Sequence, residues 1–186
     1  LGLFAMRMIE GFTLLLPFLL DDPEARQRYD VELARVTRQV GERLGTVPLQ
    51  DGAEGAKELE RCMKTLGFKG VQILTNVAGN ELSDPAYAPF WKKAEELGAL
   101  VVIHPNGFTD GKRLSRFYFN NVVGNPFETT LALHYLIFDG VIERHPNLKI
   151  LAVHGGGFLP AYSGRIDHAW GARSDCQANL PKPPTS

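Results

Sequence analysis

The sequence predicts an α/β protein in which parallel strands alternate with helices. Strand-like segments alternate about five times with segments whose apolar residues recur three and four positions apart, the pattern of βαβ units. The strands at residues 99–103 and 148–153 are unbroken aliphatic runs, as in a parallel sheet that is covered on both faces. Each run is followed by a histidine, His104 or His154, and then by residues that interrupt regular structure, Pro105 or three glycines.

The first 50 residues predict two strands around one helix. The apolar run at residues 12–16 predicts a buried strand, since it is too short to span a bilayer. Asp21 or Asp22 can cap the next helix, whose apolar residues lie three and four positions apart. Residues 44–49 predict a short strand that ends at a proline.

The middle of the chain predicts further strand and helix units. In order, these are a helix at 51–67, a strand at 70–75, a polar loop at 76–84, a helix at 85–97 and the first strand that ends in histidine. A long irregular connection at 106–121 follows.

The last third predicts two helices around the second strand that ends in histidine. The first, at 128–144, is expected to carry Glu128, Asp139 and Glu143 on its polar face. The second runs from about residue 158 to 173, and a Pro-rich tail from about residue 177 is expected to be loose.

Composition limits the class of protein. A chain of 186 residues with 44% hydrophobic and 22% charged residues is typical of one globular domain, here 1–186, and no linker marks a second one. The net charge of -1 argues against nucleic acid as a partner, and no segment predicts a membrane span. Cys62 and Cys176 lie far apart and form no disulfide framework, which favours a reducing, cytoplasmic setting.

Two parallel architectures fit this order of elements, a closed barrel and an open doubly wound sheet. No glycine-rich phosphate fingerprint follows the first strand, which argues against a dinucleotide-binding sheet. Five units are too few to close an eight-stranded barrel.

The two histidines are the main candidates for chemistry. His104 stands where a strand of the sheet ends, and a neutral imidazole there is a natural Zn²⁺ ligand; the alternative is a ring bonded to a backbone carbonyl. His154 precedes a flexible glycine turn and can donate or accept a proton near neutral pH, unless that turn serves packing alone. His134 and His145 are expected to be structural or solvated.

The long connection after His104 supplies candidate substrate contacts. Arg113 and Arg116 could bind a substrate carboxylate with two hydrogen bonds, or they could be solvated loop residues. Asn121, at the end of the same connection, is a third candidate.

The chain resembles the amidohydrolase-related (amidohydrolase 2) decarboxylase family through several motifs in order. They are GTVPLQ at 45–50, LGFKGVQI at 66–73, VIHP at 102–105, GNPFETT at 124–130, HGGG at 154–157 and GRIDH at 164–168. The resemblance implies a distorted TIM (β/α)8 barrel of the metal-dependent hydrolase superfamily, with a divalent metal, usually Zn²⁺, at its mouth. It implies that His104 binds the metal and that His154 handles protons beside it.

The activity implied is the loss of CO₂, without oxidation, from an unsaturated or aromatic carboxylic acid, with no organic cofactor. The family also carries a His-x-His pair on its first strand and an aspartate ligand on its last, and this sequence has neither. We therefore expect a partial barrel, about strands 2 to 6, from a chain truncated at both ends. One histidine is too few for Zn²⁺.

Two alternatives to the decarboxylase remain open. A hydrolase of the same superfamily, acting on a lactone or a C–C bond, would use the same metal, base and barrel. A non-catalytic barrel fragment would instead survive by pairing with another chain, because an open barrel exposes strand edges. A homodimer is possible, and the expected partner is a small carboxylic acid.

Overall fold

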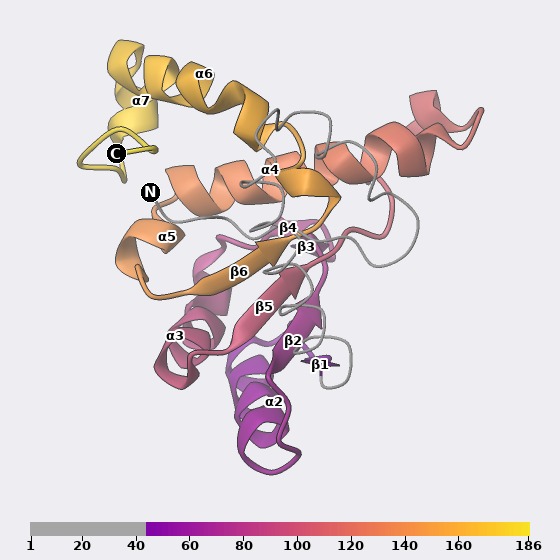
Figure 1. Cartoon of the computed structure of the whole chain (residues 1–186), viewed down its shortest axis with the longest axis vertical. Coiled ribbons are helices and arrows are strands. Elements are labelled where there is room, and N and C mark those ends of the chain that lie inside the picture. Colours follow the sequence, from indigo (N-terminus) through magenta and orange to yellow (C-terminus); the bar gives the residue numbers. More distant parts are fainter. Residues whose placement is uncertain (1–43) are drawn as a thin grey trace, which may run out of the picture.

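The computed structural model describes residues 44–186, so the strand predicted at 12–16 and the helix after it lie outside the described residues. A parallel sheet of four strands forms the centre of the described part (Figure 1). Its strands are β1 (Leu44–Gly45), β2 (Gly70–Ile73), β5 (Leu100–Ile103) and β6 (Lys149–Ala152), in the order β1-β2-β5-β6. The predicted strands at 70–75, 99–103 and 148–153 are confirmed.

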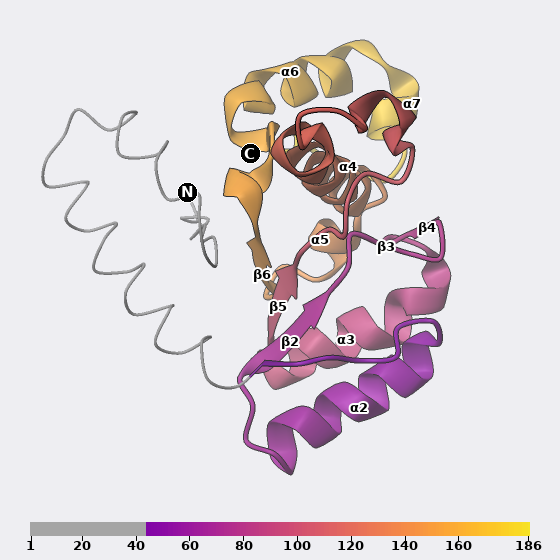
Figure 2. The same ribbon diagram turned by 90° about the vertical axis from the view of Figure 1, so that its right-hand side faces the viewer.

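The order of the strands distinguishes a barrel from a doubly wound sheet. Each strand lies beside its predecessor in the sheet and the order never reverses, whereas a doubly wound sheet reverses at a switch point. The connecting helices α2 (Gly52–Lys64), α3 (Ala88–Leu97), α4 (Asn125–Phe138) and α5 (Val141–Arg144) contribute to one hydrophobic cluster with the strands. Figures 1 and 2 show α2 and α3 side by side against the sheet. The described part is therefore an open segment of a TIM-like barrel, as the sequence predicted.

Strand β5 is buried on both faces, as its unbroken aliphatic run predicted. Val101 and Ile103 belong to the larger cluster beneath the helices. Val102, one residue out of phase, packs with Leu151 and Val153 on the opposite face of the sheet. His104 shares the parity of Val102, so it follows the strand on that second face.

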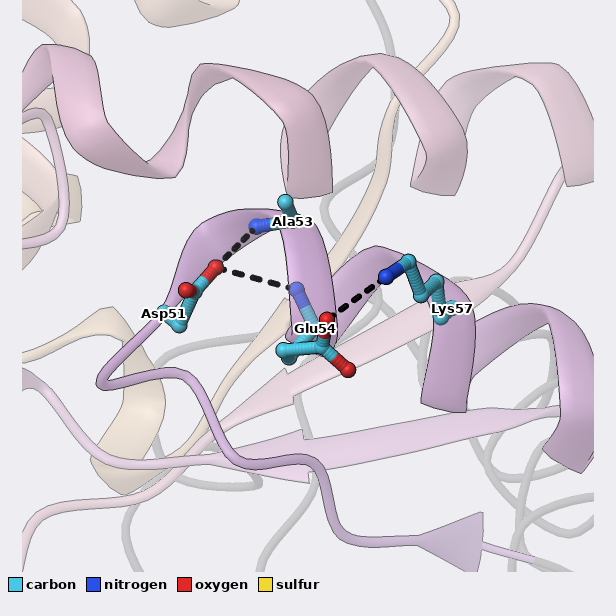
Figure 3. Close-up of polar contacts among 4 residues, drawn as sticks. All are labelled: Asp51, Ala53, Glu54 and Lys57. Carbon is cyan, nitrogen blue, oxygen red and sulfur yellow. Dashed lines mark hydrogen bonds and ion pairs between the residues drawn. The ribbon is translucent and has the colours of Figure 1, made fainter.

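Helix α2 shows how local chemistry fixes the ends of an element. Asp51 is its N-cap: Oδ1 accepts from the backbone N of Ala53 at 2.8 Å and of Glu54 at 3.0 Å (Figure 3). Glu54 forms an exposed ion pair with Lys57 at 2.6 Å. Since exposed ion pairs contribute little, the cap is the stronger determinant of where α2 begins.

Three predicted elements differ from the structure. The strand predicted at 44–49 is only the two residues of β1. The polar loop at 76–84 contains a short antiparallel hairpin, β3 (Asn76–Val77) with β4 (Asn80–Glu81), and buries Leu82, whose carbonyl accepts from Trp91 Nε1 at 2.8 Å. The helix predicted at 128–144 is two helices, α4 and α5, because Gly140 has a left-handed φ of 71° and ends the α-helical geometry.

The polar face assigned to that helix was wrong at Glu128, whose exposure is only 4%. Its carboxylate accepts two hydrogen bonds from Thr109, one from the backbone N and one from Oγ1, both at 2.7 Å. These bonds compensate the carboxylate for the water that it loses on burial.

The last elements are α6 (Leu159–Ala172) and α7 (Ser174–Gln177). The tail after α7 contacts α6, because the Leu180 carbonyl accepts from Trp170 Nε1 at 3.1 Å and Thr185 bonds to Asp167. Its looseness in solution stays a prediction. No helix among residues 44–186 is long and apolar enough to cross a membrane.

Candidate functional site

The two histidines lie together at the carboxyl ends of neighbouring strands. β5 and β6 pair in parallel with Ile103 opposite Ala152, so the residues just beyond them reach the same edge of the sheet. The rings of His104 and His154 meet edge to face, with centroids 5.3 Å apart and planes at 60°. Their predicted proximity, on two strands about 50 residues apart in the chain, is present in the structure.

His104 is oriented by its own backbone. Its Nδ1 lies 2.7 Å from the carbonyl oxygen of Pro105, and a carbonyl can only accept, so Nδ1 carries the proton. The neutral ring then has its lone pair on Nε2. The structure shows the bond to a backbone carbonyl, and metal binding by His104 stays a prediction. The two are compatible, because proteins also use such a bond to orient a histidine that binds metal through its other nitrogen.

His154 sits in a tight left-handed turn. Its φ is 53°, an uncommon value for a residue with a side chain, and the three glycines after it have φ values of 68°, 74° and 62°. Strained non-glycine backbone of this kind concentrates at functional sites. The side chain is fixed in turn by α4, where Thr129 Oγ1 lies 3.1 Å from His154 Nδ1.

Burial, and secondarily the neighbouring His104, lowers the pKa of His154 from its ordinary value of 6.5 to about 4. Desolvation and a second ring that can carry positive charge both disfavour the imidazolium form. At neutral pH His154 is therefore a neutral imidazole that can accept a proton, which suits a proton-handling role.

The loop after His104 is tied to the same helix. Three consecutive backbone N–H groups, at residues 107–109, donate to side-chain oxygens of Asn125 (3.0 Å), Asn120 (3.0 Å) and Glu128 (2.7 Å). Asn125 and Glu128 belong to the first turn of α4, and Asn120 begins the π-helical turn η4 (Asn120–Gly124) before it. The start of α4 thus contacts the segments that follow both strands.

Sequence reasoning missed Asn125 and Thr129 as site residues. Both are buried, and both lie in phase with the apolar residues Ala132, Leu133 and Leu136 of the same helix. Polar residues that continue a buried helical stripe are a usable signal, because burial requires them to find hydrogen-bond partners.

The candidate substrate contacts remain predictions. Arg113 and Arg116 are exposed, and the guanidinium of Arg116 lies 4.7 Å above the ring of Phe117. Neither arginine, nor Asn121, forms a hydrogen bond with His104 or His154 in the structure.

The described residues do not complete a metal site. Between residues 44 and 186, no group of three or more His, Cys, Asp or Glu side chains could bind a metal ion. The two histidines offer at most two nitrogen donors, fewer than the three or four protein ligands that Zn²⁺ takes.

The described residues form an open segment of a TIM-like barrel with two histidines paired at the ends of neighbouring strands. Residues 21–175 match the family model described as "Amidohydrolase", and the chain belongs to this family. Among curated proteins, it is 43% identical over 132 residues to 2-amino-3-carboxymuconate-6-semialdehyde decarboxylase of Dictyostelium discoideum, covering 71% of this chain and 37% of that protein. It is 31% identical over 162 residues to gamma-resorcylate decarboxylase of Polaromonas sp., covering 78% of this chain and 49% of that protein.

Solved structures show the same likeness. The 5-carboxyvanillate decarboxylase of Sphingomonas paucimobilis superposes with a TM-score of 0.65 at 26% identity, over 80% of this chain and 46% of that one. Dihydroxybenzoic acid decarboxylase of Polaromonas sp. JS666, solved with manganese and 2-nitroresorcinol, gives 0.61 at 28% identity, over 79% and 49%. The chain spans less than half the length of each of these relatives. The family predicted from the motifs is confirmed.

Proposed function

We propose that this chain is part of a metal-dependent decarboxylase that removes CO₂, without oxidation, from an unsaturated or aromatic carboxylic acid. The observation that carries the proposal is the His104–His154 pair, two oriented imidazoles 5.3 Å apart at the mouth of a barrel segment. The decarboxylases among its relatives, whose names specify aromatic or unsaturated acids, support the same reaction class.

The two histidines have different roles in this proposal. His104, with its Nδ1–H donated to a carbonyl, offers Nε2 to a divalent metal. The metal would supply Lewis-acid polarisation, and Zn²⁺ remains our first candidate although relatives have been solved with manganese. Since residues 44–186 contain no three-ligand group, we derive no step through the metal.

The proton chemistry falls to His154. Neutral at pH 7, it accepts a proton and delivers it to the ring or enamine carbon that bears the carboxylate. The electron pair of the C–C bond to the carboxylate then returns to that carbon's conjugated system as CO₂ leaves. The delivered proton stays on the carbon in place of CO₂, so each turnover consumes one proton.

The experiment compares the 186-residue chain with a chain extended by the genomic reading frame on either side. Each is dialysed against Zn²⁺ or Mn²⁺ and analysed for bound metal, then for CO₂ release from 2,6-dihydroxybenzoate, 5-carboxyvanillate and related acids. We expect the extended protein to bind one metal per chain and to release CO₂. His104→Ala should lose the metal, whereas His154→Asn should retain the metal and lose CO₂ release by about 100-fold or more, as for a missing general acid–base.

Two results would refute the proposal. The first is unchanged CO₂ release by His154→Asn, with His168→Gln, an exposed histidine on α6, as the matched control. The second is hydrolysis of lactones in place of CO₂ release, which would favour the hydrolase of the same superfamily. Stoichiometric metal with CO₂ release by the 186-residue chain alone would exclude the non-catalytic fragment. Dimerisation and a cytoplasmic location also stay proposals, and gel filtration and localisation would test them.

A further inference from the structure

The side chain that contacts His154 is a hydroxyl from another element. Thr129 on α4 is fully buried, and its Oγ1 lies 3.1 Å from His154 Nδ1 and 3.1 Å from the backbone oxygen of Asn125. A hydroxyl has one proton to donate and can accept on its lone pairs. The direction in which Thr129 donates therefore decides which nitrogen of His154 carries hydrogen.

The geometry favours one direction. Thr129 Oγ1 donates to the Asn125 carbonyl, which can only accept, and this commits its one proton. The contact to His154 is then made by Nδ1–H as donor and Oγ1 as acceptor. A serine or threonine hydroxyl bonded to the carbonyl four residues earlier is a common arrangement within helices.

We propose that Thr129 is a positioning residue that holds His154 in the Nδ1–H tautomer and so leaves its Nε2 as the proton acceptor. The tautomer stands independently of any reaction; its use in proton handling rests on the proposed function. Because Thr129 is buried, a water molecule has little access to replace its hydroxyl.

Asn125 extends this positioning to the other histidine. Its backbone oxygen accepts from Thr129, while its side-chain Oδ1 accepts from the backbone N of Gly107 at 3.0 Å, three residues after His104. One residue in the first turn of α4 thus fixes both the Thr129 hydroxyl and the segment that follows His104. The helix positions the two rings relative to each other.

Two other histidines of this chain serve as internal references for the tautomer of His154. His104 and His134 donate from Nδ1 to the carbonyls of Pro105 and Thr130, both at 2.7 Å, so both must be Nδ1–H when neutral. His154 differs from these two because its Nδ1 contacts a hydroxyl, which can either donate or accept. Long-range ¹H–¹⁵N correlation spectra of the ¹⁵N-labelled, metal-free chain above pH 7 distinguish protonated from unprotonated ring nitrogens for all of these residues.

We expect wild-type His154 to show the pattern of the two references. Thr129→Val, which replaces the hydroxyl with a methyl group of similar size, should shift the His154 tautomer ratio about tenfold toward Nε2–H, the change that one ordinary hydrogen bond produces. Thr129→Ser should restore the wild-type pattern. Thr130→Val is the matched control, since its hydroxyl accepts from the backbone N of Phe158 at 2.9 Å and has no bond to His154.

An Nε2–H pattern in wild-type His154 would overturn the proposal, and this measurement needs no variant to fold. So would an unchanged ratio in Thr129→Val whose amide spectrum shows it folded. Failure of this proposal can be distinguished from failure of the proposed function. A confirmed tautomer without CO₂ release by the extended protein would refute the decarboxylase and leave the positioning role of Thr129 intact. The reverse outcome would refute only the role of Thr129.

Discussion

Acid should destabilise this protein through His154, because folding lowers the pKa of that ring. The ordinary value is 6.5 and the folded value about 4, so between pH 6.5 and pH 4 the unfolded chain binds the extra proton. Stability rises with pH wherever the unfolded state binds more protons. The contribution of His154 is therefore fully present above pH 6.5 and is lost progressively as pH falls to about 4.

The magnitude follows from the size of the shift. At about 1.4 kcal/mol per pKa unit, the full lowering would correspond to about 3 kcal/mol. Because the ring is only half-buried, solvent screening reduces this to about 1–2 kcal/mol. A loss of that size is a measurable share of a typical domain stability of about 5–15 kcal/mol.

The assay is urea unfolding of the 186-residue chain at pH 7.5, 6.0 and 5.0, compared with His154→Asn. Asparagine tolerates the left-handed backbone at this position better than most residues, so the variant removes the titrating ring at small conformational cost. We expect wild type to lose about 1 kcal/mol more than the variant between pH 7.5 and 5.0, since the contribution is only partly lost at pH 5.0. Equal losses in the two proteins would refute the reasoning, and His168→Gln controls for removal of an exposed imidazole.

Three further substitutions test the packing around the site and the start of helix α2. Glu128→Ala should destabilise the fold by about 1–2 kcal/mol in urea titrations, since two hydrogen bonds from Thr109 to a buried carboxylate are lost, and Glu128→Gln, which keeps one carbonyl, should cost less. Gly157→Ala should lower the free energy of unfolding by more than about 2 kcal/mol, because the residue has a positive φ and its new Cβ would overlap oxygens of α4. Gly79→Ala is the control: it also has a positive φ but open space around it, so it should cost only about 1 kcal/mol. Equal effects of the two substitutions would contradict the packing argument. Asp51→Ala should cost about 1 kcal/mol by thermal melting through loss of the α2 N-cap, and an unchanged melting temperature would count against that cap.

The strands and the edge of the sheet could be predicted because their signals are local. An aliphatic run such as 99–103 has few alternatives to a buried strand, and the histidine after it must then lie at the end of that strand. Parallel pairing brings the ends of neighbouring strands to one edge, so the meeting of His104 and His154 followed from topology alone. The predicted and observed helix 85–97 agree for the same reason, since the helical segments η2 (Pro85–Tyr87) and α3 fall within it and Gly98 ends it in a left-handed conformation.

The features that escaped prediction depend on partners distant in the chain. Glu128 has the sequence signature of a solvated face, and only the Thr109 donors, 19 residues earlier, make its burial tolerable. Thr129 meets His154 across 25 residues, a pairing that no periodicity encodes. The break at Gly140 inside the helix predicted at 128–144 was missed for another reason: a single glycine inside a helical pattern costs only about 1 kcal/mol and need not end the helix.

The hydrogen bonds among the described residues orient both histidine rings, but they do not provide the further ligands that a metal centre would need. His104 and His154 both have Nδ1 bonded to groups within residues 104–154, so neither ring requires an outside partner to orient it. Each ring is left with Nε2 for chemistry. Additional ligands would therefore have to reach these nitrogens without reorienting either ring. For that reason the orientation of the two histidines can be measured in the 186-residue chain, whereas the proposed metal binding and CO₂ release would need ligands beyond those found among residues 44–186.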